Sequence, residues 1–169
     1  MANPRSLHGP RPNRQPIDGV PFDPRPVTLT AGNTLREAIE AMERTRQPGI
    51  PVLDSDGHYV GMCTVRAIAD MCLPVAGVLM ATMPSASFMA DGASSARRRI
   101  EGRLDESVAS FVDPSAPTLA DGAAISSALF ALFERHAVLP VVSHDGLLIG
   151  TVRWTDILLA IAQGPDTRA

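Results

Sequence analysis

The chain has 169 residues, of which 45% are hydrophobic and only 4% aromatic, so it can bury a core that is mostly aliphatic. Its formal net charge of −3 argues against a nucleic-acid-binding protein that works through a broad basic surface. With two cysteines and no apolar run near its start, the chain resembles a reduced cytoplasmic protein more than a disulfide-rich secreted one.

Two segments differ in composition from a regular folded domain. Residues 1–24 are rich in Pro, Arg and Asn, and we expect them to form a disordered basic tail. Residues 71–90 carry no charge and are about as long as a membrane-spanning helix. Because Pro74, Gly77 and Pro84 interrupt this run and no aromatic belt flanks it, we expect a buried or subunit-contact helix and no membrane insertion.

The first half of the folded region predicts a short strand, a helix, a hairpin and a second helix. The first helix opens at Thr34, which has the capping-box spacing to Glu37, and apolar residues then recur at helical period. An Asp-Ser-Asp-Gly turn at residues 54–57 separates the two hairpin strands. The predicted strands and the second helix cover residues 27–30, 50–53, 59–64 and 66–73.

The second half predicts the same elements in the same order. The hairpin turn is Asp145-Gly146, because Asp-Gly tolerates the positive φ of a hairpin corner. The predicted elements are a short strand at 118–119, a helix that starts at Asp121 or Ala123, strands at 138–142 and 148–152, and a helix over 156–162.

Thr155 and Asp156 stand where the last predicted strand becomes a helix. A hydroxyl and a carboxylate side by side at such a junction can hydrogen-bond a ligand next to the helix N-terminus. The alternative is local, because Thr and Asp are also preferred residues for capping a helix.

The two halves are an internal repeat. Before the strand pair, equivalent residues are separated by 90 positions, and within the strand pair by 89, so one residue is missing from the second loop. The equivalent pairs are Thr28 and Thr118, Leu29 and Leu119, Pro51 and Pro140, Gly57 and Gly146, and Gly61 and Gly150. This pattern predicts a duplicated βαββα unit whose two copies pack sheet to sheet and share a core.

The repeat divides the chain into a tail and three further regions. We expect a first unit at 25–73, a helical linker at 74–107 and a second unit at 108–164. The linker contains the basic cluster Arg97-Arg98-Arg99. Such a cluster is either a solvated helix face or a surface that neutralises a phosphate or an acidic partner.

The duplicated pattern resembles the CBS-domain family, and in particular a tandem pair of CBS units. The residues that carry the resemblance are T-L-x-x-G, P-V followed by D-G, and a later hydrophobic-Gly step, each present twice, with Thr155-Asp156 closing the second copy. The resemblance implies an α/β (α+β) fold in which two βαββα CBS units stack about a pseudo-twofold axis. It also implies clefts between the units that bind adenosine derivatives such as AMP, ADP, ATP or S-adenosylmethionine.

In the second unit, the resemblance assigns ligand-binding roles to three polar residues. Asp156 would accept hydrogen bonds from the ribose hydroxyls, and Thr155 would donate to a phosphate oxygen. Arg153 occupies a position where the family often has Thr or Ser, and its guanidinium would pair with phosphate. The residues assigned to the adenine slot are Thr118, Val138 and Leu139, and Pro140 is a further expected ligand-binding residue.

The first unit departs from this pattern. Its equivalents of Thr155 and Asp156 are Arg66 and Ala67, and an alanine cannot hold a ribose. We therefore expect one competent cleft in each chain and a weaker first-unit cleft. The residues assigned to that weaker cleft are Thr28, Ile50 and Arg66.

Nothing in the sequence predicts catalysis or an obligatory cofactor. Nucleophile-elbow, P-loop and zinc-protease motifs do not occur, and the four histidines lack metal-ligand spacing. We therefore expect a non-catalytic regulatory module, without a metal site, that binds an adenine nucleotide as effector and signals to an unknown partner protein.

Two other functional hypotheses remain open at this stage. The first is a ligand-free scaffold for dimerisation or interaction, and a homodimer is expected under either reading because tandem CBS modules often pair. The second and weaker one is an adaptor that binds nucleic acid or a membrane surface through the Arg97 cluster, which the acidic net charge disfavours.

Overall fold

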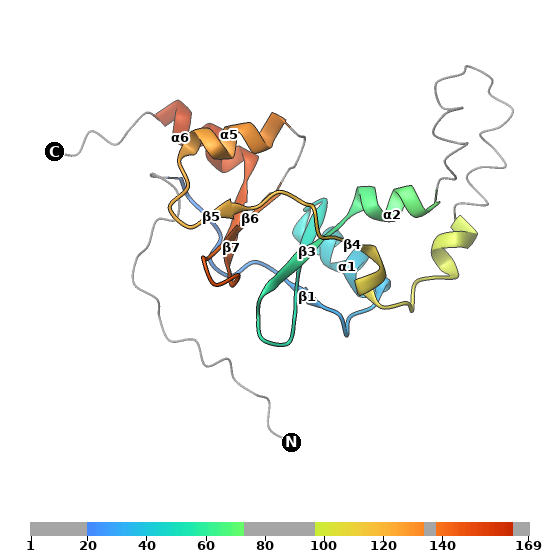
Figure 1. Cartoon of the computed structure of the whole chain (residues 1–169). Helices are drawn as coiled ribbons and strands as arrows, with labels where there is room; N and C mark the ends of the chain where they lie inside the picture. Colours follow the sequence, from blue (N-terminus) through green and yellow to red (C-terminus); the bar gives the residue numbers. More distant parts are fainter. Residues whose placement is uncertain (1–19, 73–96, 134–137, 164–169) are drawn as a thin grey trace, which may run out of the picture.

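The computed structural model describes residues 20–72, 97–133 and 138–163, and it contains two small sheets, each accompanied by helices (Figure 1). The first sheet has the order β1-β2-β3-β4 and the second the order β5-β6-β7. The first sheet comprises β1 (Leu29–Thr30), β2 (Gly49–Leu53), β3 (Tyr59–Thr64) and β4 (Val112–Asp113). The second comprises β5 (Leu119–Ala120), β6 (Val138–Val142) and β7 (Leu148–Arg153).

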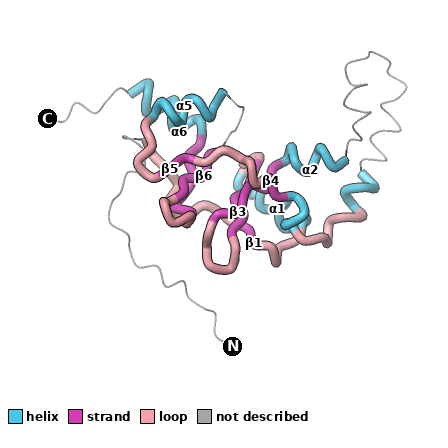
Figure 2. Tube along the Cα trace, viewed as in Figure 1, coloured by secondary structure: helices cyan, strands magenta, loops and turns pink. Residues whose placement is uncertain are grey.

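The helices divide between the same two units. Figure 2 shows α5 and α6 beside the second sheet and α1 and α2 beside the first. The helices are α1 (Leu35–Thr45), α2 (Val65–Cys72), the 3₁₀ helix η1 (Val108–Phe111), α5 (Ile125–Phe133) and α6 (Trp154–Gln163). Residues 1–19 of the expected tail and most of the charge-free 71–90 segment lie outside the described residues.

Helix α1 forms as its local sequence predicts. The Glu37 N–H donates to Thr34 Oγ1 at 3.3 Å, and the Thr34 N–H donates to Glu37 Oε2 at 2.7 Å, which completes the capping box. At the other end, Arg46 takes the left-handed conformation with φ 55° and closes the helix. The buried face contains Leu35, Ala38, Ala41 and Met42.

The other helix starts differ from the prediction by one to four residues. Helix α5 begins at Ile125 because a turn precedes it, in which the Ala123 N–H donates to the Ala120 carbonyl at 3.0 Å. Helix α6 begins at Trp154, so Thr155 and Asp156 lie inside its first turn and not before it. The predicted strands at 59–64 and 138–142 have the observed bounds.

The two hairpins repeat each other in detail, which confirms the duplication. In each, the strands are antiparallel and the first strand pairs in parallel with a short leading strand, β1 or β5. The pairing shifts register between Val52 and Leu53 in one hairpin, and between Val141 and Val142 in the other. These two positions are equivalent in the repeat.

A short leading segment stands at the start of each unit, residues 20–24 in the first and 108–113 in the second. Each leading segment pairs with the sheet of the other unit. Asp23 bridges to Thr151 on β7, with N···O distances of 2.8 and 2.9 Å, and Val20 is buried in the second core. Reciprocally, β4 pairs with β3, and Val108 and Phe111 lie in the first core. In Figure 1 the start of the described chain (blue) lies beside β7.

This exchange corrects one expected boundary, the end of the tail. Residues 20–24 were expected to belong to the disordered tail, but Val20 is 1% exposed and Asp23 is paired. Residues 108–113 follow the linker and start the second unit in sequence, as predicted, and in space they also complete the first core and sheet. Sequence order did not show this, because Asp23 and Thr151 are 128 positions apart and Cys63 and Val112 are 49 apart.

The same exchange explains the repeated glycine of the second hairpin strand. A Cβ at Gly61 would lie 2.5 Å from the Asp113 carbonyl oxygen, and one at Gly150 would overlap the Asp23 backbone and the Phe22 ring. Only a residue without a side chain lets the leading strand of the other unit approach this closely.

The units also touch through their hairpin tips. The Tyr59 N–H donates to the Gly146 carbonyl at 2.9 Å, and His58 bridges to Leu147. Together with the exchanged segments, these contacts join two mostly aliphatic cores. The first contains Leu29, Leu35, Ile50, Val52, Val108 and Phe111, and the second Val20, Leu119, Leu139, Val141, Val152 and Ile157.

Candidate functional site

The candidate site is the junction where β7 ends and α6 begins. Arg153 is the last residue of β7, and Trp154, Thr155 and Asp156 form the first turn of α6. The Arg153 N–H donates to Asp156 Oδ2 at 3.1 Å, so the carboxylate closes the first turn from inside the helix. Of the two roles left open for Asp156, a local one is therefore realised, as a bond back to the residue before the helix.

The side chain of Arg153 also engages this carboxylate. Arg153 Nη2 donates to Asp156 Oδ1 at 2.8 Å, and Nε donates to Oδ2 at 3.0 Å, which is a two-pronged ion pair. The hydrogen bond to Asp156 raises the pKa of Arg153 above its ordinary value. The Asp156 side chain is 14% exposed and that of Arg153 59%. Both carboxylate oxygens are thus engaged, while much of the guanidinium faces solvent.

In the first unit, an uncharged side chain caps the start of the equivalent helix, α2. Thr64 stands in the place of Arg153, and its Oγ1 accepts the N–H of Ala67, the counterpart of Asp156, at 3.0 Å. Arg66 reaches Asp70 at 3.7 Å with both side chains largely exposed, and such a surface pair contributes little stability. The chemical asymmetry that the sequence predicts between the two units is therefore present in the structure.

The other predicted ligand-binding residues fall into two groups. Val138 pairs with Arg153 across β6 and β7, so it lies beside the ion pair, and Thr118 is exposed just before β5. Leu139 and its counterpart Ile50 are wholly buried in the two cores. Any part that Leu139 or Ile50 takes in binding therefore goes through its backbone. The remaining assigned residues are Pro140, which is buried on β6, and Thr28, which is half-buried before β1.

One polar residue near this junction was missed by the sequence reasoning. Thr151 is 1% exposed, and its hydroxyl has no hydrogen-bond partner among the described residues. Side chains alternate along a strand, so Thr151 and Arg153 lie on the same face of β7. Its counterpart in the first unit is Met62. The presence of a hydroxyl where the other unit has an apolar side chain was the sequence feature that could have identified Thr151.

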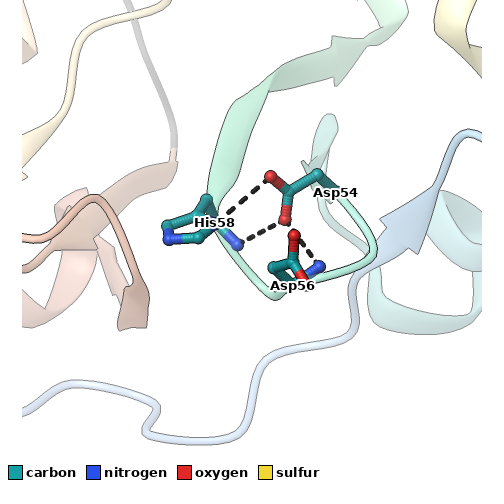
Figure 3. A group of neighbouring side chains, drawn as sticks. All are labelled: Asp54, Asp56 and His58. Carbon is teal, nitrogen blue, oxygen red and sulfur yellow. Dashed lines mark hydrogen bonds and ion pairs between the residues drawn. The ribbon is translucent and has the colours of Figure 1, made fainter.

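A second polar cluster lies at the tip of the first hairpin (Figure 3). Asp54, Asp56 and His58 offer ligand atoms within 4.8 Å of one another, a proximity that the scattered histidines did not predict. Asp54 Oδ1 accepts the N–H groups of Asp56 and His58 at 2.9 and 2.8 Å, and Oδ2 lies 3.2 Å from His58 Nδ1. The His58 N–H holds the pKa of Asp54 below its ordinary value. These bonds explain the cluster as a stabilised turn.

In the basic cluster of the linker, Arg97 is paired with an acid. Residues 97–101 are helical, and Arg97 Nε donates to Glu101 at 2.7 Å. Arg103 pairs with Glu106 at 2.9 Å and lies 4.9 Å from the centre of the Phe111 ring. Arg97, Arg98 and Arg99 are all exposed, as expected of a solvated helix face.

Helices α5 and α6 expose a set of large apolar side chains. Phe130 is 75% exposed and Leu159 51%. The other members are Trp154, Leu158 and Ile161, each 44% exposed. Within the described residues, no helix has the length and apolar character needed to cross a membrane.

Comparison with known proteins identifies the repeat and the fold. The sequence model of the CBS domain matches residues 20–73 and 108–163. No curated protein matched the chain.

Several solved structures have the same fold. CBSX2 from Arabidopsis thaliana is 22% identical with a TM-score of 0.61, over 84% of this chain and 91% of that one. A CBSX2 structure in complex with AMP is 20% identical with a TM-score of 0.60, over 84% and 92% of the two chains. A CBS domain-containing protein from Bacillus anthracis has a TM-score of 0.64 at 20% identity, over 87% and 91%.

Proposed function

The chain belongs to the CBS-domain family, and from that premise we propose that it is a non-catalytic regulatory module that binds an adenine nucleotide beside the start of α6. The observation that carries the proposal is the Arg153–Asp156 pair on the second unit, where a carboxylate and a cation stand together at a helix N-terminus. A carboxylate accepts ribose hydroxyls, and a guanidinium with a helix N-terminus binds phosphate. The AMP complex of CBSX2 supports this choice of ligand class.

The proposal includes one nucleotide per chain. Thr64 and Ala67 leave the first unit without a carboxylate at the equivalent place, so we assign the site to the second unit alone. The nucleotide would change how the two units, or two chains, pack, and a separate cytoplasmic partner protein would respond to that change.

Calorimetric titration with AMP, ADP and ATP tests the proposal. We expect one site per chain in the wild type and, in Asp156→Asn, an affinity at least about tenfold weaker, because a charge-assisted acceptor is lost. Asp70→Asn is the matched control. Asp70 also pairs with an arginine, Arg66 in the first turn of α2, but it lies in the first unit. Full affinity in Asp156→Asn, or no binding of any of the three nucleotides by the wild type, would contradict the proposal.

The exposed apolar face of α5 and α6 favours a second function, as a homodimerisation scaffold. In a symmetric dimer the same surface is used by both copies, and a charge near the twofold axis would face its own copy, so an uncharged surface suits this arrangement. Helix α5 has no charged residue, and the single acid of α6, Asp156, is paired with Arg153. A second copy of this chain therefore fits this face better than a charged partner does.

Light scattering on the purified protein tests the scaffold. We expect a dimer in the wild type and a monomer in Phe130→Glu, because a charge would then lie on the proposed contact face. Val65→Glu on α2 is the control, since Val65 is also exposed, at 52%, but lies on the first unit. A dimer that survives Phe130→Glu would place the interface elsewhere.

A further inference from the structure

The leading segment of the first unit, residues 20–24, lies along the edge of β7, and we call it the strap (Figure 1). Its backbone meets β7 in an isolated bridge, where Asp23 and Thr151 share two hydrogen bonds of 2.8 and 2.9 Å. Its apolar anchors are Val20, which is buried, and Phe22, which packs against the second core. Within the described residues, the strap is thus held by one bridge and two apolar side chains.

The residues on either side of Asp23 keep this bridge from becoming a longer ladder. Hydrogen-bonded positions recur at every second residue of an antiparallel pair, so Pro21 and Arg25 would be the next to bond. Pro21 has no N–H to donate. The Arg25 N–H donates to Asp23 Oδ1 at 2.9 Å and not to β7. The backbone contact of the strap with β7 is therefore confined to Asp23.

The leading segment of the second unit is held more firmly. Two of its residues pair with β3, and Val108 and Phe111 are both buried in the first core. The Val108 N–H also donates to the Asn33 carbonyl at 2.8 Å. Segments with few buried contacts and few backbone bonds open at the lowest free energy. The strap should therefore open more readily than residues 108–113.

A cation of β7 lies beside the strap. Asp23 and Thr151 stand directly opposite each other, and every second side chain of a strand points to the same face. Asp23 and Arg153 are therefore diagonal neighbours on one face of the sheet, within reach of a long side chain. The hydrogen bond to Asp156 is the main cause that raises the pKa of Arg153, and the charge of Asp23 acts in the same direction.

We propose that the strap is a conformational device that opens from β7 while both cores stay folded, and that Asp23 latches it by attraction to Arg153. Closing the strap places a second carboxylate near Arg153, and opening it leaves Arg153 with Asp156. An anion bound at this junction would therefore favour the open strap, and an open strap would favour the anion. This link to the ligand rests on the proposed function, whereas the opening itself does not.

The amide of Thr151 reports the opening directly, because its N–H donates to the Asp23 carbonyl at 2.9 Å. Hydrogen exchange of the full chain, followed by NMR, measures this opening. The reference is the amide of Met62, which pairs with Asp113 at the equivalent place in the first unit. We expect Thr151 to exchange at least about tenfold faster than Met62 and than the amides shared by β6 and β7, each relative to its unstructured rate. Equal exchange would refute a separate opening.

Val20→Ala tests the apolar anchor of the strap. Loss of two buried carbons should speed the exchange of Thr151 by about tenfold and leave the amides shared by β6 and β7 unchanged. Val52→Ala is the matched control, because Val52 is similarly buried, at 2% exposure, but lies in the first core. Equal acceleration of Thr151 and of the β6–β7 amides in Val20→Ala would show that the strap and the second core open together.

Asp23→Asn tests the latch, because it removes the charge and keeps an acceptor oxygen. We expect the exchange of Thr151 to become about threefold faster, as suits the loss of an exposed charge attraction. Asp113→Asn is the matched control. Asp113 Oδ1 likewise accepts the N–H two residues on, at 2.9 Å, but its diagonal neighbour on β3 is the uncharged Thr64. Unchanged exchange of Thr151 in Asp23→Asn, or an equal acceleration of Met62 in Asp113→Asn, would refute the charge latch.

Addition of AMP to the wild type tests the link between the strap and the candidate site. In the AMP complex we expect Thr151 to exchange at least about twofold faster than in the free protein. Unchanged or slower exchange, in a complex that calorimetry shows to form, would refute the link. If AMP does not bind, the proposed function fails, and the exchange of Thr151 in the free protein still decides whether the strap opens.

Discussion

At the residue scale, the chemistry of this chain depends on which polar groups are paired. The Asp156 carboxylate is saturated by Arg153, whereas the buried Thr151 hydroxyl lacks a partner among the described residues. Burial also affects Cys63, because it raises the pKa of the thiol to about 11 and keeps the thiol protonated at neutral pH. The sequence shows these side chains but not their surroundings.

Thr151→Val should stabilise the protein. A buried hydroxyl without a partner costs roughly 1–3 kcal/mol, and valine has almost the same shape without the polar group. We expect the free energy of unfolding in urea to rise by about 1 kcal/mol. Thr45→Val is the control, because the Thr45 hydroxyl donates to the Ala41 carbonyl at 2.8 Å, so its loss should bring no gain. A Thr151→Val variant that is less stable than the wild type would show that this hydroxyl is satisfied in solution.

At the element scale, the helices differ in how predictable their starts are. Helix α1 begins where Thr34 and Glu37 predict, because both halves of its capping box are local in sequence. Helix α6 begins two residues before its predicted start, because Asp156 bonds back to Arg153 from inside the first turn. Local pattern therefore identified each helix, and the identity of the capping group decided the boundary.

The capping box of α1 predicts a difference in acid stability. The Thr34 N–H, followed by Asn33, lowers the pKa of Glu37 below its ordinary value of 4.5. A carboxyl with a lowered pKa in the folded state stabilises the fold above that ordinary value, and this contribution is lost as pH falls through the folded pKa. The melting temperature of the wild type should therefore drop more steeply on acidification below 4.5 than that of Glu37→Gln, which keeps an acceptor oxygen but does not titrate.

The comparison isolates Glu37 because the other affected carboxyls are present in both proteins. Hydrogen bonds also lower the pKa values of Asp54 and Glu106, and they contribute equally to each acid profile. Parallel profiles for the wild type and Glu37→Gln would mean that the capping box has no pH-dependent share in stability.

At the scale of the whole molecule, the two units are joined by exchanged leading segments. Val20 packs in the second core, and Val108 with Phe111 packs in the first, so neither unit completes its core from its own contiguous sequence. Each unit alone is also too short to bury much apolar surface. We therefore expect the pair, and not the single unit, to be the cooperative folding unit.

Gly150→Ala should disrupt this exchange. A methyl group there would overlap the Asp23 backbone and the Phe22 ring, and the cost of overpacking is roughly 1–3 kcal/mol. We expect a lower urea midpoint, with Gly32→Ala as the control, because a Cβ at Gly32 would lie 3.7 Å from Thr30 Oγ1, which is ordinary contact. Equal midpoints for the two variants would mean that the leading segment does not pack on β7 in solution.

The sequence by itself determined the duplication, the order of the elements, the two Asp-Gly turns and the chemical asymmetry between Asp156 and Ala67. These features are carried by local patterns and by comparison of one half of the chain with the other. The tertiary structure alone decided that Asp23 pairs with Thr151, that Arg153 forms an ion pair with Asp156, and that Leu139 is buried in the second core. The physical reason is that strand pairing, burial and side-chain ion pairs depend on which atoms meet in space, and spacing along the chain does not specify those meetings.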